Sequence, residues 1–179
     1  KLVRESRLQT TIFRPSVIFG RDDSFLNLFA GLAAVLPVLA LACPNAKFQP
    51  VFVEDVARAF VSSLGNTDTF GQSYDLCGPR AYTLRQLVEY VCRITGHERT
   101  IIGLGDHMSY LQALAMEFMP VQLMTRDNYY SMKVDSVCGC DFPSIFGIKP
   151  APMETVVPLY LAEGTPRARY RWFRYKARR

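Results

Sequence analysis

The sequence predicts an α/β fold in which parallel strands are covered by helices. Residues 10–15 and 73–76 have the β-branched and aromatic side chains that favour strands. Parallel sheets are covered on both faces, which explains the continuous apolar character of Ile12-Phe13. We expect these two segments to be neighbouring buried strands. The helices that follow Asp55 and Thr83 should pack around them.

The first predicted helix follows Asp22-Asp23-Ser24, whose side-chain oxygens can accept hydrogen bonds from its first amides. Pro37 should end it, because proline cannot donate to the preceding turn. Its apolar residues recur at helical spacing on one stripe, which consists of Phe25, Leu28, Phe29, Leu32 and Leu36. We expect this stripe to face the core.

A second helix is predicted after the short extended segment 51–53. Asp55 stands where a carboxylate can satisfy the first amides of this helix, and Gly65-Asn66 should end it. The apolar stripe of the helix holds Val56, Ala59, Phe60 and Leu64. We therefore interpret Asp55 as a helix cap that binds no ligand.

The clearest helix begins at Thr83, because Thr83-Leu-Arg-Gln86 has the spacing of a capping box. Gly96 should end it. Residues 100–102 have the composition of a short strand. Three more helices are predicted at 106–119, 125–132 and 150–162, the last of them kinked by Pro158.

The composition indicates one globular body, residues 1–166, followed by a basic aromatic tail. With 49% hydrophobic and 21% charged residues, the 179-residue chain can form one core. Residues 167–179 hold seven of the 21 basic side chains and no acidic one. The longest apolar run, Leu28 to Cys43, is shorter than the roughly 20 residues of a membrane-spanning helix and contains Pro37. We predict no transmembrane segment.

The five cysteines predict free thiols in a reducing compartment. Their number is odd, and a chain of this size needs no disulfide to fold. Cys138-Gly-Cys140 is too closely spaced for structural zinc, and His97 and His107 form no ligand pair. We expect no metal site.

Gly103-Leu-Gly105 lies between a predicted strand and a predicted helix, as the first two glycines of a dinucleotide-binding turn do. The third glycine position is Met108, whose side chain would obstruct the close approach of helix and strand. We interpret the segment as an ordinary strand-to-helix turn.

Seven short segments, taken in order, form the most specific pattern in the chain. They are Thr11–Gly20, Phe25-Leu-Asn27, Pro37-Val38, Phe48–Ala57, Tyr74–Pro79, Tyr82-Thr-Leu84 and Thr125–Asn128. From Leu2 to about Ala162, the chain resembles an atypical branch of the extended short-chain dehydrogenases. That branch is related to the nucleotide-binding accessory subunit of respiratory complex I.

The resemblance implies a Rossmann-type fold that holds NAD or NADP. The chain would form the C-terminal part of this fold, with its last parallel strands and a small, mostly helical substrate domain. The Gly-rich turn that holds the pyrophosphate would then precede Lys1. We therefore expect a missing N-terminal half to bind most of the dinucleotide.

Carried over to this sequence, the resemblance places Pro15, Ser16 and Val17 beside the nicotinamide. Backbone and hydroxyl groups there can bond to its carboxamide. The alternative is a strand end whose proline merely terminates the ladder. Arg14 needs an anionic or carbonyl partner, and we expect a structural carboxylate.

Tyr129 and Lys133 have the spacing of the acid–base pair of active short-chain dehydrogenases, with one helical turn between them. In that family the pair precedes the strand that residues 10–15 resemble. We therefore interpret this pair as a coincidence and predict no catalytic residue within the chain.

Three functions remain open. The first is an NAD(P)-binding protein with a structural or complex I-associated role and weak or no turnover. The second is an active oxidoreductase or nucleotide-sugar epimerase or dehydratase whose Tyr-Lys pair lies upstream. The third is a module that binds a membrane or RNA surface through the tail, with nucleic acid the less favoured ligand. The expected location is cytoplasmic or peripheral to the inner membrane, on the matrix side in a eukaryote. A membrane surface or membrane protein would then contact Arg167–Arg179.

Overall fold

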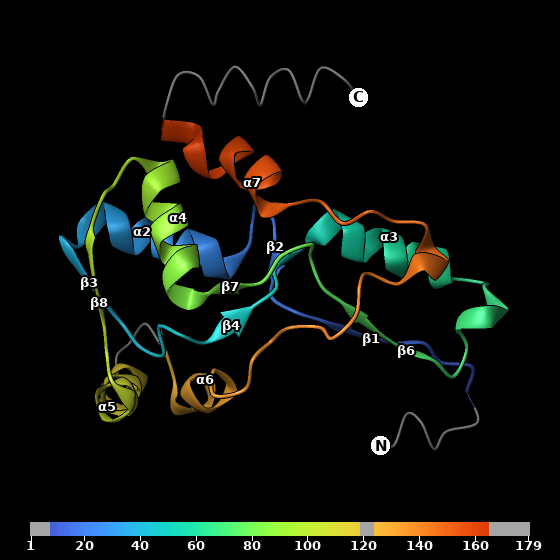
Figure 1. Ribbon diagram of the computed structural model, residues 1–179, viewed down its shortest axis with the longest axis horizontal. Coiled ribbons are helices and arrows are strands. Elements are labelled where there is room, and N and C mark those ends of the chain that lie inside the picture. Colours follow the sequence, from blue (N-terminus) through green and yellow to red (C-terminus); the bar gives the residue numbers. More distant parts are fainter. Residues whose placement is uncertain (1–7, 119–123, 165–179) are drawn as a thin grey trace.

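A computed structural model describes residues 8–118 and 124–164 (Figure 1). Strand β1 (Ile12–Pro15) pairs in parallel with β6 (Ser73–Leu76), and Ile12 lies opposite Ser73. This confirms that residues 10–15 and 73–76 are neighbours. The pair is only half-buried, since the Pro15 end of β1 is exposed.

The chain continues from β1 into β2 (Ile18–Phe19) and changes its pairing partner on the way. The Ser16 amide donates to the Leu76 carbonyl at 3.0 Å, whereas the Val17 carbonyl accepts from the Val51 amide at 2.9 Å. Strand β2 then runs parallel to β5 (Val51–Phe52). One extended segment therefore joins two strand pairs.

Two further pairs complete the strands of the described residues. Strand β3 (Val38–Leu41) is parallel to β8 (Thr100–Gly103), and β4 (Lys47–Phe48) is antiparallel to β7 (Tyr82–Thr83). We did not predict β3. Its residues alternate between exposed and buried, but all four are apolar, so the sequence carries no period-two signal.

The helices agree closely with their predicted positions, except for the last. Their bounds are α2 Ser24–Val35, α3 Val53–Ser63, α4 Leu84–Thr95, α5 Asp106–Glu117, α6 Arg126–Ser131 and α7 Met153–Val156. Short 3-10 turns are η1 Thr67–Thr69, η2 Ser144–Phe146, η3 Val157–Leu159 and η4 Leu161–Gly164. The predicted helix at 150–162 is broken into α7, η3 and η4, because Pro158 cannot donate the next helical hydrogen bond.

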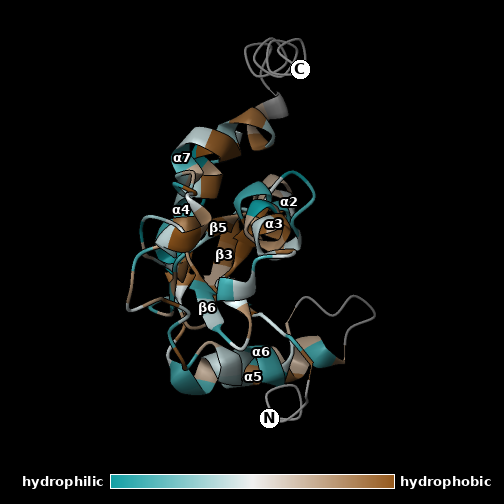
Figure 2. Ribbon diagram, turned by 90° about the vertical axis from the view of Figure 1, so that its right-hand side faces the viewer, coloured by the Kyte–Doolittle hydropathy of each residue, from teal (hydrophilic) through white to brown (hydrophobic). Residues whose placement is uncertain are grey.

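The buried apolar side chains form two main clusters. In one, α2 and α4 pack against each other and against Met153 and Val157. In the other, α3 packs on β1 and β6 through Val56 and Ala59. Our expectation that the helix after Thr83 covers the β1–β6 pair was wrong, because α4 uses its apolar face on α2 instead (Figure 1). Figure 2 shows the hydrophobic colour concentrated on the central strands β3 and β5.

The start of α4 has the predicted capping box. The Thr83 hydroxyl accepts from the Gln86 amide at 3.2 Å, and the Gln86 side chain accepts from the Thr83 amide at 2.9 Å. Gly96 ends the helix in the left-handed conformation, with φ of 73°. Both ends of α4 are therefore as the sequence predicts.

Thr83→Ala is expected to lower the free energy of unfolding by about 1 kcal/mol, because the Gln86 amide loses its acceptor. Thermal unfolding measures this change, with Ser62→Ala on the exposed face of α3 as the control. An unchanged midpoint for Thr83→Ala would mean that the hydroxyl contributes nothing to the helix.

Two of the five cysteines form a disulfide, which corrects the expectation of free thiols throughout. Cys77 and Cys138 are joined with their Cα atoms 6.0 Å apart, and Cys43, Cys92 and Cys140 are free. Sequence spacing could not reveal the pair, because the fold brings together residues 61 positions apart. Within the described ranges, His, Cys, Asp and Glu form no cluster that could hold a metal ion. None of the helices placed by the structure is long and apolar enough to span a membrane.

Candidate functional site

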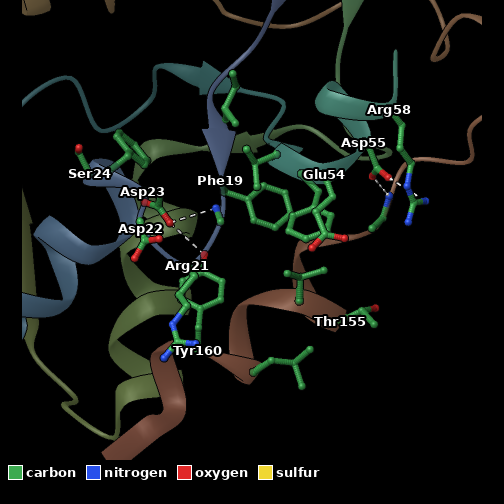
Figure 3. Close-up of a pocket in the computed structure, with 18 of the residues that line it drawn as sticks. Phe19, Arg21, Asp22, Asp23, Ser24, Glu54, Asp55, Arg58, Thr155 and Tyr160 are labelled. Carbon is green, nitrogen blue, oxygen red and sulfur yellow. Dashed lines mark hydrogen bonds and ion pairs between the residues drawn. The ribbon is translucent and has the colours of Figure 1, made fainter. Parts of the chain in front are cut away.

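A pocket of about 1070 Å³ opens at the ends of β2 and β5 (Figure 3). The two strands are parallel, so their carboxyl ends meet at the same edge. Each strand leads into a helix, α2 after β2 and α3 after β5, and residues from the first turn of both helices line the pocket. Ligands of open α/β sheets bind at this edge. Apolar lining comes from Phe19, Phe25, Phe52, Val53, Val156 and Leu159.

Asp23 forms one end of the pocket. One carboxylate oxygen accepts from the Leu26 amide at 2.5 Å and caps α2, as the sequence predicts. The other accepts from the Gly20 amide at 3.3 Å and from the Tyr160 hydroxyl at 3.0 Å. Asp23 therefore ties the C-terminal segment to the start of α2.

Asp55 forms the other end and corrects our interpretation of it as a helix cap. Helix α3 starts two residues earlier, at Val53, and has no side-chain cap. The Asp55 carboxylate is 3% exposed and accepts from the Ala151 amide at 2.7 Å. Arg58 lies 3.9 Å from its other oxygen. Asp55 therefore holds residues 149–160, which we call the roof, over the pocket.

The pocket has a mixed electrostatic character. Asp22, Asp23, Glu54 and Asp55 contribute carboxylates, and Arg21, Arg58 and Lys149 contribute cations. The N-termini of α2 and α3, which carry partial positive charge, also face the pocket. Such a lining suits a ligand with an apolar body and several hydrogen-bonding or charged groups. The described lining contains no cysteine or histidine.

Tyr160 is a half-buried phenol of the roof. Burial raises its pKa above the ordinary tyrosine value, and the negative charge of Asp23 raises it further. The neutral phenol is therefore the form that donates to Asp23. Folding thus favours the protonated side chain.

Tyr160→Phe is expected to lower the free energy of unfolding by about 1 kcal/mol near pH 8, because the bond to Asp23 is lost. The folded state holds the phenol proton more tightly than the unfolded chain does. The contribution of Tyr160 is therefore complete below the unfolded pKa of about 10 and declines at higher pH. Urea unfolding at a series of pH values should show the two proteins converging above that pKa. A difference independent of pH would contradict this.

The segment Pro15, Ser16 and Val17 lies where β1 passes into β2, just before the pocket wall. The Ser16 hydroxyl donates to the Ser136 carbonyl at 2.6 Å and accepts from the Gln49 amide at 3.2 Å. Pro15 is exposed and the other two residues are half-buried. In this structure Ser16 therefore bonds within the chain.

Tyr129 and Lys133 lie on and just after α6, in a cluster separate from the pocket lining. The Tyr129 hydroxyl donates to Asp106 at 2.7 Å, and the Lys133 ammonium lies 3.3 Å from the same carboxylate. The ring of Tyr129 is buried, at 3% exposed. These contacts attach α6 to the first turn of α5, which agrees with a structural pair.

Two smaller expectations are confirmed. Arg14 pairs with the Asp75 carboxylate at 2.7 Å, although its side chain is more exposed than we expected. Gly103-Leu-Gly105 is a strand-to-helix turn between β8 and α5.

Sequence reasoning did not assign the roof, or the hydrogen bonds of Asp23 and Asp55 that hold it, to a functional site. The sequence signal that could have indicated the pocket was the position of Gly20–Ser24, directly after a short strand and before a helix.

Several curated proteins that resemble the chain are subunits of mitochondrial NADH dehydrogenases. The chain is 33% identical over 161 residues to NADH dehydrogenase (ubiquinone) 1 alpha subcomplex subunit 9 of Mus musculus, covering 86% of this chain and 42% of the mouse protein. It is 34% identical over 93 residues to the 40 kDa subunit of NADH-ubiquinone oxidoreductase of Neurospora crassa. This match covers 52% of this chain and 24% of the Neurospora protein. The chain thus spans less than half of these relatives. No protein-family model matches it.

Solved structures identify the fold. A nucleoside-diphosphate-sugar epimerase of Staphylococcus aureus matches with a TM-score of 0.60 and 16% identity, over 90% of this chain and 55% of the epimerase. UDP-glucose 4-epimerase of Thermotoga maritima, solved with UDP-glucose, matches with a TM-score of 0.58 and 17% identity. The match covers 89% of this chain and 47% of the epimerase. The α/β fold is thus that of Rossmann-type epimerases. The chain therefore belongs to the family of NADH dehydrogenase (ubiquinone) 1 alpha subcomplex subunit 9 and has the α/β fold of these epimerases.

Proposed function

We propose that the chain forms the substrate-side part of an NAD(P)-binding, short-chain dehydrogenase-like protein that associates with respiratory complex I. The observation that carries the proposal is the 33% identity to the mouse subunit over 86% of this chain. The same likeness supports a mitochondrial location on the matrix side of the inner membrane. The pocket at the carboxyl ends of β2 and β5 supports ligand binding at this edge.

In this proposal, NAD or NADP is held mainly by residues outside the chain. A Gly-rich turn, a helix N-terminus and an acidic residue supply most of the binding energy for a dinucleotide. The segment Pro15, Ser16 and Val17 lies beside the nicotinamide, where the backbone groups that do not pair with Leu76 or Val51 can bond to its carboxamide. The pocket under the roof then binds the ligand, if any, that lies next to the nicotinamide. The protein uses the cofactor structurally or turns it over slowly.

Calorimetry with NADH and NADPH tests the cofactor assignment. The full-length protein is expected to bind at least one of them with micromolar or tighter affinity, whereas the 179-residue chain should bind neither. Small molecules released from the heated full-length protein identify which nucleotide travels with it. Micromolar binding by the 179-residue chain alone would contradict the proposal that residues outside it bind most of the dinucleotide.

Native electrophoresis of mitochondrial membranes tests the association. Antibody against the full-length protein should detect it in the band that carries NADH dehydrogenase activity. Detection only at the mass of the free protein would contradict the complex I role. The basic tail, proposed to contact an anionic membrane surface, lies outside the described residues. Vesicle sedimentation with and without residues 167–179 tests that contact separately.

The alternative is an active oxidoreductase or sugar-nucleotide epimerase or dehydratase, and the fold shared with UDP-glucose 4-epimerase favours it. It requires a Tyr-x-x-x-Lys pair in the residues that precede β1 in the full-length protein. Turnover of a UDP-sugar that is abolished by Tyr→Phe at that pair would establish the alternative. Turnover that depends on Tyr129 instead would show that our structural interpretation of this pair is wrong.

A further inference from the structure

Residues Asp135–Cys138, which we call the strap, contact β4 and the segments that directly follow β1 and β6. The Ser136 amide donates to the Lys47 carbonyl at 2.8 Å, and the Ser136 carbonyl accepts from the Gln49 amide at 3.0 Å. The Ser16 hydroxyl also donates to this carbonyl, at 2.6 Å. Hydrogen bonds rather than apolar contacts therefore hold the strap, and its Val137 is exposed.

The disulfide fastens the end of the strap to the end of β6. Cys77 directly follows Leu76, the last residue of β6, and is 3% exposed, whereas Cys138 is half-buried. The Cys138 amide donates to the Gln49 side chain at 3.0 Å. Gln49 in turn donates to the Gly78 carbonyl at 2.7 Å. The disulfide and these hydrogen bonds therefore all connect the end of the strap to Gln49 and to Cys77-Gly78.

A third cysteine stands two residues further along the chain. Cys140 is exposed and free, and only Gly139 separates it from Cys138. Gly139 is exposed, and a Cβ added to it would meet nothing within 4 Å, so the backbone between the two cysteines is uncrowded at this residue. Of the two bonded sulfurs, that of Cys138 belongs to the more accessible residue. Access decides which sulfur an incoming thiolate attacks.

We propose that Cys138-Gly139-Cys140 is a thiol–disulfide exchange site that fastens and releases the strap. The Cys140 thiolate attacks the sulfur of Cys138, the bond from Cys138 to Cys77 breaks, and the Cys77 thiolate leaves and takes up a proton. The disulfide has then moved to Cys138–Cys140, with no net oxidation or reduction. The reverse attack by Cys77 restores the fastened state.

Exchange removes the only covalent link between the strap and β6 among the described residues. The strap is then held by hydrogen bonds alone, and these break locally far more often than the global fold does. Opening would free the Ser16 hydroxyl and the Gln49 side chain. The inference concerns this motion and holds whether or not a dinucleotide binds nearby.

Disulfide mapping tests the exchange directly. The full-length protein is incubated in a glutathione redox buffer, quenched in acid, unfolded, alkylated and digested for mass spectrometry. We expect peptides with Cys138 bonded to Cys77 and others with Cys138 bonded to Cys140. Cys140→Ser should remove the second species and slow the release of Cys77 about tenfold, because a neighbouring thiol acts at high effective concentration.

Cys43→Ser is the matched control, because Cys43 is also free and packs against a different cluster, that of Ala42, Ala113, Met124 and Tyr129. Its release rate should equal that of wild type. Hydrogen exchange supplies a second readout: a dithiol reductant should weaken protection of the Ser136 and Cys138 amides about tenfold or more, while α4 stays protected. The proposal is overturned if Cys140→Ser releases Cys77 at the wild-type rate. It is equally overturned if reduction leaves strap protection unchanged.

Discussion

Gly78→Ala is expected to lower the free energy of unfolding by about 3 kcal/mol or more, because the new methyl group has no space. An alanine Cβ at this position would overlap the Pro50 carbonyl oxygen and lie 2.9 Å from its carbon. Both are backbone atoms that precede β5 and cannot rotate away. The Gly78 amide also donates to the Gln49 carbonyl, so the two segments cannot separate without losing that bond.

Denaturant unfolding measures the loss, and Gly31→Ala is the matched control. Gly31 lies within α2, and nothing would lie within 4 Å of its added Cβ. Alanine there is expected to stabilise by up to about 1 kcal/mol, since it restricts the unfolded chain and favours helix. The same chemical change should thus have opposite signs at the two positions. Equal effects would show that the contact with Pro50 is not restrictive.

Asp55→Ala is expected to cost about 2 to 3 kcal/mol, because the Ala151 amide is left without an acceptor in a half-buried position. The cost should appear mainly as opening of the roof. Hydrogen exchange at Ala151 and Thr155 would report this opening, and urea unfolding would give the total. Asp55→Asn should recover part of the loss, since its side-chain oxygen can still accept from the amide.

Asp22→Ala is the control for Asp55→Ala. Asp22 lines the same pocket, and its replacement by alanine removes the same charge. Its side chain, unlike that of Asp55, is exposed. We expect a change within about 0.5 kcal/mol. If both variants opened the roof equally, the effect would come from pocket charge rather than from the Asp55 hydrogen bond.

The sequence predicted best those features that depend on neighbouring residues. The capping box at Thr83, the cap at Asp23 and the left-handed Gly96 each involve groups within one helical turn, so their spacing carries the information. The pairing of β1 with β6 was predicted from composition and resemblance. Pro158 was correctly predicted to disturb the last helix, although it breaks the helix rather than bending it.

Features that depend on distant residues were missed. Asp55 looked like a cap because it lies near the start of a helix, yet its partner, Ala151, is 96 residues away. The disulfide joins residues that only the folded strap brings together. Strand β3 was hidden because both of its faces are apolar. In each case the structure is decided by tertiary contacts, which the spacing of neighbouring residues in the sequence does not reveal.

The change of partner between β1 and β2 also orders the closure of the chain. The β2–β5 pair closes a shorter loop than the β1–β6 pair, and it lies inside that longer loop. Closing a shorter loop costs less entropy. Once Ile18 meets Val51, β1 ends three residues before this contact, at Pro15, and β6 begins 22 residues after it, at Ser73. The outer pair then closes a shorter effective loop than it would alone, so this parallel arrangement can assemble in order from the pocket outwards.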